Sequence, residues 1–215
     1  MESISIAKRK CDFRFAPAVN DFHRRLQLRE SGVRILGRDD NPLIEAFEQA
    51  IASSVALCRE LCSYEMRWAL RNYKDTGLLS DELGVWLEMA EAMTLDDYRQ
   101  ALQRRGEMRA RLEALRPLAD GLITLSCVGP APPLDASVDS GEAAYAFKTG
   151  SPAFTAFTSA TGAPAISLPL VAMQGLPVGV QLVGQPHDDW RLCGHARWMM
   201  GHIEPLRVLP RALSS

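Results

Sequence analysis

The spacing of hydrophobic and polar residues along the chain predicts strands and helices in alternation. Short apolar runs, some alternating with polar residues and several bounded by Gly or Pro, are typical of strands. Strands are predicted over residues 3–7, 32–37, 120–126, 164–170 and 177–183. Apolar residues spaced three and four apart indicate amphipathic helices. Helices are predicted over residues 17–29, 42–73, 80–93, 94–115, 154–161 and 188–200.

Capping and turn residues support several of these boundaries. Asn41 precedes Pro42, which suits the first position of a helix, and Thr94 stands three residues before Asp97 in a pattern like a capping box. A hairpin turn is predicted near Gln174 and Gly175, and a long loop over residues 128–145, which is rich in Gly, Pro and Ser. The fold class expected is α/β, with a mixed β-sheet layered with helices.

Composition narrows the class of protein. The 215 residues are 47% hydrophobic and 23% charged, with a formal net charge of -2. This charge does not favour nucleic acid or an anionic membrane as a partner. No apolar run reaches the roughly 18 residues that a membrane helix needs. Five irregularly spaced cysteines indicate free thiols, so a cytoplasmic location is expected.

Residue chemistry alone does not reveal a catalytic set. Ser126 ends a predicted strand before a Gly- and Pro-rich loop, but no Gly-x-Ser-x-Gly elbow surrounds it. Ser159 and Thr161 fit the end of a helix and the following turn. Cys193 and His195 fall on different faces of the last helix, so no metal site is expected there. No metal and no cofactor are predicted.

Two stretches near the C-terminus carry a family pattern. Residues 150–170 read GSPAFTAFTSATGAPAISLPL, and residues 175–184 read GLPVGVQLVG. Together they resemble the amidase signature family. The glycines and prolines suit tight turns and close backbone packing, and the glutamine, polar within an apolar strand, should find a hydrogen-bond partner. The motif residues are Gly162, Pro164, Pro169, Gly175, Pro177, Gly179, Gln181 and Gly184.

The resemblance implies that part of the enzyme is missing. Members of that family hydrolyse amide bonds with a Ser-Ser-Lys triad, whose serines lie in a Gly- and Ser-rich segment that this sequence lacks. We therefore expect residues 1–215 to form a single partial amidase domain, with segments 1–118 and 119–215. No catalytic residue is transferred to this chain. The residues that the resemblance places as candidates for the wall of a substrate pocket are Ser126, Cys127, Phe154, Phe157 and Ser159.

Three functions follow as alternatives. The first is the C-terminal portion of an amidase, inactive alone and acting on a small-molecule amide when an N-terminal half completes it. The second is a non-catalytic interaction protein, or a decayed gene product, that keeps the fold. The third is a metal or thiol enzyme built on Cys193 and His195. For the first, a sheet edge left without its neighbour predicts self-association.

Overall fold

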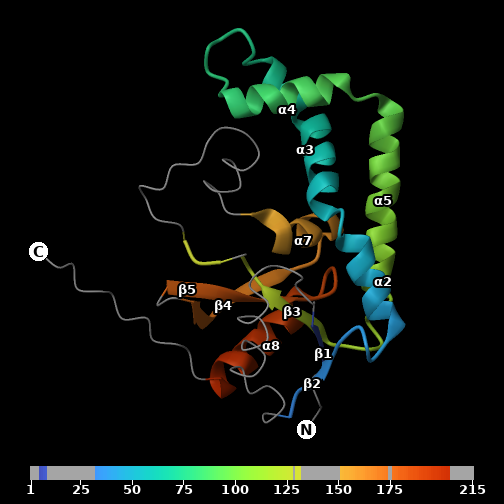
Figure 1. Cartoon of the computed structure of the whole chain (residues 1–215), viewed down its shortest axis with the longest axis vertical. Coiled ribbons are helices and arrows are strands. Elements are labelled where there is room, and N and C mark those ends of the chain that lie inside the picture. Colours follow the sequence, from blue (N-terminus) through green and yellow to red (C-terminus); the bar gives the residue numbers. More distant parts are fainter. Residues whose placement is uncertain (1–4, 9–31, 128, 132–150, 174–175, 204–215) are drawn as a thin grey trace, which may run out of the picture.

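A mixed β-sheet forms the base of the molecule (Figure 1). In the computed structural model the described residues are 5–8, 32–127, 129–131, 151–173 and 176–203. Across them the sheet has five strands in the order β2-β1-β3-β5-β4. Strand β1 pairs in parallel with β2 and β3, whereas β5 is antiparallel to both β3 and β4. The strands are β1 Ser5–Lys8, β2 Arg34–Leu36, β3 Gly121–Leu125, β4 Ala165–Met173 and β5 Leu176–Val183. The predicted single mixed sheet and its antiparallel hairpin are confirmed.

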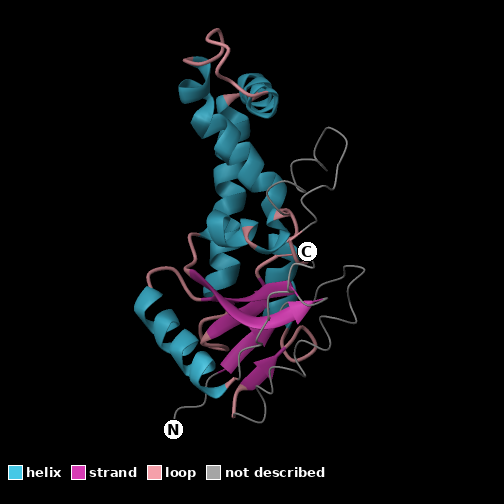
Figure 2. Cartoon of the chain, turned by 90° about the vertical axis from the view of Figure 1, so that its left-hand side faces the viewer, coloured by secondary structure: helices cyan, strands magenta, loops and turns pink. Residues whose placement is uncertain are grey.

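Helices cover both faces of the sheet (Figures 1 and 2). Helix α8 packs on one face, and α2, α3, α5 and α7 lie over the other. The outer halves of α3 and α5 extend away from the sheet with α4 across their ends, and form an arm. The helices are α2 Pro42–Ile51, α3 Ser54–Arg71, α4 Asp81–Ala92, α5 Leu95–Glu113, the 3-10 turn η1 Pro152–Phe154, α7 Ala156–Thr161 and α8 Asp189–His202.

The two faces of the sheet bury two separate apolar cores. Ile123, Val180 and Leu182 face α8, where they join Leu192 and Met199. The neighbouring positions in the same strands point the other way, so Leu122 and Val183 pack with the helices of the opposite layer. The period of two in the strands is therefore what separates the two cores.

Local capping chemistry fixes the starts of two helices as predicted. The side chain of Asn41 accepts a 2.9 Å hydrogen bond from the backbone N–H of Leu43, before α2. Thr94 and Asp97 form a reciprocal capping box before α5. Such caps satisfy backbone N–H groups that have no partner within the helix.

The prediction of one helix over residues 42–73 is wrong. The backbone leaves helical geometry at Ser53, so α2 and α3 are separate. The N–H of Ala52 bonds to the carbonyl of Gln49, three residues back, which tightens and ends α2. Serine favours helix ends over helix interiors, and the break lets each helix turn its own apolar side chains into the core. Hydrophobic period alone cannot detect such a break.

Two other boundaries differ from the predicted ones. Strand β4 continues past Pro169 to Met173, with an irregular register between Leu168 and Val171. Proline cannot donate to the ladder, but β4 is an outer strand of the described sheet and tolerates it. Helix α7 begins at Ala156 because η1 occupies the preceding residues.

Several predicted features lie outside the described residues. They are the strand residues 3–4, the helix 17–29, most of the loop 128–145 and the turn at Gln174 and Gly175. Among the helices that are described, none combines the length and apolar character needed to cross a membrane.

Candidate functional site

Polar residues form a row across the three strands β3, β5 and β4. Thr124 pairs with Gln181 across β3 and β5, and Gln181 pairs with Ser167 across β5 and β4. Ser126 lies two residues after Thr124, just past the end of β3, and its backbone N–H donates a 2.9 Å hydrogen bond to the carbonyl of Gly179. Paired residues share a face of the sheet, so these side chains interrupt an otherwise apolar sheet on one side. We call Thr124, Ser126, Ser167, Gly179 and Gln181 the polar row.

Gly179 sits between two hydroxyl groups. The Oγ of Ser126 donates a 3.1 Å hydrogen bond to the Gly179 carbonyl. A Cβ placed on Gly179 would stand 2.1 Å from the Oγ of Ser167 and 2.3 Å from that of Ser126. The absence of a side chain is therefore what allows both hydroxyls to approach this point. Close packing was expected at both Gly179 and Gly184. At Gly179 the neighbouring atoms belong to serine side chains, and at Gly184 they belong to Pro164 and Leu192.

Gln181 is buried and bonded, as the sequence predicts. Its side chain is 4% exposed, and its Nε2 donates a 2.9 Å hydrogen bond to the carbonyl oxygen of Phe154. This bond ties β5 to η1, which leads into α7. The signature glutamine thus positions the segment in which three of the candidate pocket residues lie.

The five candidate pocket residues occupy different environments. Phe154 and Phe157 are almost fully buried, and Phe157 packs edge-on against Phe47 with ring centroids 5.9 Å apart. Ser159 is exposed on α7, and Cys127 is half-buried with its Sγ 3.0 Å from the carbonyl of Gly129. The rings of Phe154 and Phe157 belong to different apolar clusters. A pocket role for these residues stays a prediction.

Sequence reasoning missed Thr124 and Ser167. Thr124 is 4% exposed, and its Oγ1 has no hydrogen-bond partner among the described residues. It borders a cavity of about 10 Å³ together with Phe47 and Phe157. The sequence does show polar residues at alternate positions of two apolar strands. Only the pairing of β3, β5 and β4, however, brings these residues together on one face of the sheet.

The described residues give little support to a thiol or metal enzyme. Burial raises the pKa of the Cys58 thiol and that of the Cys62 thiol, which disfavours the reactive thiolate. No three His, Cys, Asp or Glu side chains in the described part of the chain gather as metal ligands. A Ser-x-x-Lys spacing occurs from Ser5 to Lys8, within β1.

Comparison with known proteins identifies the family. The model of the family described as Amidase matches residues 45–193. The chain belongs to the amidase family. A search of curated proteins found no match.

Solved structures of amidase-like enzymes share the fold. One described as an amidase has 20% identity and a TM-score of 0.75, and the alignment covers 94% of this chain and 46% of that one. Kluyveromyces lactis allophanate hydrolase has 16% identity and a TM-score of 0.67, with coverage of 95% and 33%. A bacterial aryl acylamidase has 17% identity and a TM-score of 0.64, with coverage of 95% and 44%. This chain therefore spans between a third and a half of the length of these amidase-like structures.

Proposed function

We propose that this chain forms the C-terminal portion of an amidase, which hydrolyses amide C–N bonds by acyl transfer to a serine, and that it is inactive alone. The observation that carries the proposal is the combination of a family match over residues 45–193 with coverage of 46% or less of the amidase-like structures compared. The sequence also lacks the Gly- and Ser-rich run that supplies the nucleophile and oxyanion hole in the family.

Ser126 is better suited to a structural role than to a nucleophilic one. Its hydroxyl donates to the Gly179 carbonyl, whereas a nucleophilic serine directs its proton to a general base. The polar row would then help to form the wall of a substrate pocket that the missing portion completes. The substrate we expect is a small-molecule amide, with no nucleic acid, membrane or cofactor involved. Four described cysteines are free, which supports a cytoplasmic protein.

Paired activity measurements test the proposal. The chain would be purified alone and also together with an N-terminal amidase half, encoded directly upstream or taken from a relative. Each sample would be assayed with a panel of aryl amides. We expect no turnover from the chain alone and turnover from the pair. Replacing the nucleophilic serine of the added half should abolish it, whereas Ser126→Ala in this chain should leave hydrolysis detectable.

Two results would contradict the proposal. Amide hydrolysis by the chain alone that Ser126→Ala abolishes would place the nucleophile in this chain. Failure of any N-terminal half to bind the chain would instead favour a non-catalytic interaction protein that keeps the amidase fold.

A further inference from the structure

A cleft of about 570 Å³ opens between α5, the end of α7 and the segment that joins β5 to α8. This volume lies within the range of about 300–1,000 Å³ that is typical of small-molecule sites. Nothing in the proposed amidase function uses it. The residues that line it and bear on its chemistry are Arg109, Glu113, Arg116, Gly162, Gln185 and His187.

Arg109 presents a guanidinium group to this cleft. Its Nε donates a 3.0 Å hydrogen bond to the carbonyl of Thr161, which anchors the group. A Cβ on Gly162 would stand 3.5 Å from its Nη2, and Gly162 has a left-handed φ of 72° that disfavours any side chain there. Within the described residues the Nη groups make no other hydrogen bond. An anchored guanidinium with a free fork suits a carboxylate, which it can bind through two hydrogen bonds.

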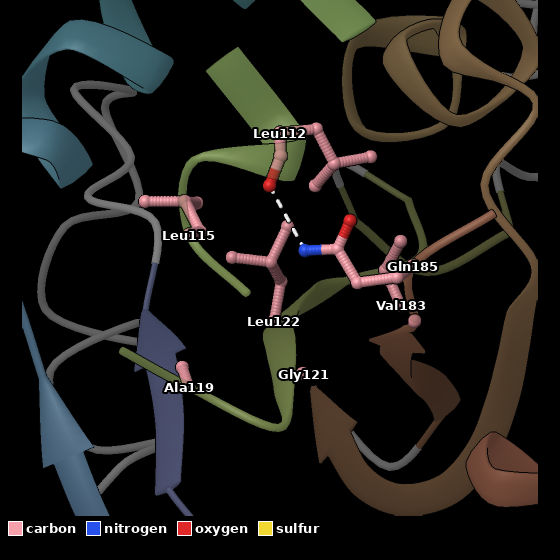
Figure 3. Close-up of a pocket in the computed structure, with 8 residues that line it drawn as sticks. Leu112, Leu115, Ala119, Gly121, Leu122, Val183 and Gln185 are labelled. Carbon is pink, nitrogen blue, oxygen red and sulfur yellow. Dashed lines mark hydrogen bonds between the residues drawn. The ribbon is translucent and has the colours of Figure 1, made fainter. Parts of the chain in front are cut away.

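The side chain of Gln185 offers a hydrogen-bond acceptor that has no donor among the described residues. It is 7% exposed, and its Nε2 donates a 2.9 Å hydrogen bond to the carbonyl of Leu112. Its Oε1 has no partner among the described residues. Figure 3 shows Nε2 turned toward Leu112 and Oε1 directed elsewhere. Because buried polar atoms are nearly always bonded, this oxygen is suited to a ligand N–H.

The small cavity that Gln185 also lines does not offer that donor. It holds about 10 Å³ and is lined mainly by apolar side chains, among them Leu115, Leu122 and Val183 (Figure 3). Such a space fits at most one water and gives it few polar partners. Gln185 also lines the cleft, so the cleft is the side from which a ligand N–H could be offered to Oε1.

The charges of the lining favour a ligand with both a negative and a positive end. Arg116 is already paired with Asp188 at 3.2 Å, which leaves Arg109 as the guanidinium open to an anion. Glu113 is exposed at the same cleft and attracts a cation or an N–H donor. A carboxylate on Arg109 and an ammonium shared between Gln185 and Glu113 would satisfy all three side chains.

We infer that this cleft binds a small zwitterion, with its carboxylate on Arg109 and its ammonium group on Gln185 and Glu113. The inference holds whether or not the chain works as part of an amidase. The probes would be glycine, β-alanine and γ-aminobutyrate, with acetate and methylammonium as single-charge controls. Binding would be measured by saturation-transfer NMR on the purified chain. We expect at least one zwitterion to bind about tenfold more tightly than either single-charge control.

Substitutions locate the binding. Arg109→Gln should weaken zwitterion binding by about tenfold or more, and Arg109→Lys, which keeps the charge but loses the fork, by less. Glu113→Gln should weaken it without changing acetate binding. Arg111→Gln is the matched control, because Arg111 is an exposed arginine on the same helix that does not line the cleft.

Three results would overturn the inference. They are no binding of any probe up to about 10 mM, acetate binding as tightly as the zwitterions, and Arg109→Gln weakening binding no more than Arg111→Gln. If Arg109→Gln does not fold, as judged by circular dichroism, then Arg109→Lys and Glu113→Gln decide the matter by the same criteria.

Discussion

The side-chain amide of Gln181 on β5 is hydrogen-bonded to the backbone carbonyl of Phe154, 27 residues earlier in the chain. The bond is buried, and it joins the sheet to the 3-10 turn that leads into α7. The buried side chain of Gln181 therefore links the sheet to the turn and helix that pack on it.

Gln181→Leu should destabilise the fold by about 0.5–1.5 kcal/mol, since it removes a buried hydrogen bond to the Phe154 carbonyl while keeping a similar volume. Chemical denaturation would measure the loss. The matched control is Gln103→Leu, because Gln103 is exposed on α5 and bonds to exposed Glu107 at 3.1 Å. That change should stay within about 0.5 kcal/mol. Equal effects from the two substitutions would show that the Phe154 bond contributes little.

Gly179→Ala should destabilise the fold by about 1–3 kcal/mol, because the new methyl group overlaps two serine hydroxyls. Adding Ser167→Ala relieves one of the contacts and should recover part of the loss. Thermal melts of the single and double variants would show this as a coupling between the two sites.

Gly194→Ala provides the control for that experiment. Gly194 lies in α8, and a Cβ there would meet no atom within 4 Å. The change should stabilise the chain by about 0.5–1 kcal/mol through helix propensity. A Gly179→Ala variant that is as stable as Gly194→Ala would contradict the packing seen at the polar row.

How far the sequence predicts this molecule depends on whether a feature is local. The caps at Asn41 and Thr94 were predictable because each acts within three residues of itself. The hairpin was predictable because its two strands are adjacent in the chain. The helix break at Ser53 was not, because apolar residues keep a helical period through it and the core decides the direction of each half.

The candidate site shows the same difference between local features, which the sequence predicts, and tertiary features, which it does not. Gln181 stands out in its strand, so its need for a partner was visible, but the partner Phe154 was not. Ser167 gains meaning only when β4 and β5 pair and bring its hydroxyl to Gly179 beside that of Ser126. Pairing across the sheet is a tertiary property, and strand period does not encode which strands will be neighbours.

The stability of the chain should fall on acidification, in part through His195. Burial is the main cause that lowers the pKa of His195 from its ordinary value of 6.5, with Arg191 acting in the same direction and Asp120 and Asp188 opposing. The unfolded chain then binds the proton more readily than the folded one. The stability associated with the neutral ring is fully present above pH 6.5 and decreases as the pH falls below it.

His195→Gln should therefore flatten the decrease in stability between pH 6.5 and about 5. Denaturation at several pH values would measure this, with His202→Gln as the control because His202 is exposed at the end of the same helix. A parental chain whose stability does not change over this range, or an equal effect from both substitutions, would rule out this role for His195.

The chain without a completing half should self-associate and bind a hydrophobic dye. Strand β4 is an outer strand of the described sheet, and unpaired strand edges promote pairing between chains. Large apolar side chains are also exposed on the arm, including Trp68 at 64%, Leu78 at 77% and Val85 at 64%. Apolar surface of this kind is a usual mark of an interface. Sedimentation velocity and dye fluorescence would measure both properties.

A lysine placed on the edge strand distinguishes strand pairing at the edge from non-specific association through exposed apolar surface. Ala165 is exposed in β4, so Ala165→Lys adds a charge that opposes a neighbouring strand, whereas Ala92→Lys adds the same charge at the exposed end of α4. Association through the edge predicts that only Ala165→Lys shifts the chain toward monomer. Equal shifts would place the contact elsewhere. If the parental chain is instead a monodisperse monomer that binds no dye and melts cooperatively, the described sheet and arm need no further cover, and an independent interaction module becomes the better account of this amidase-family chain.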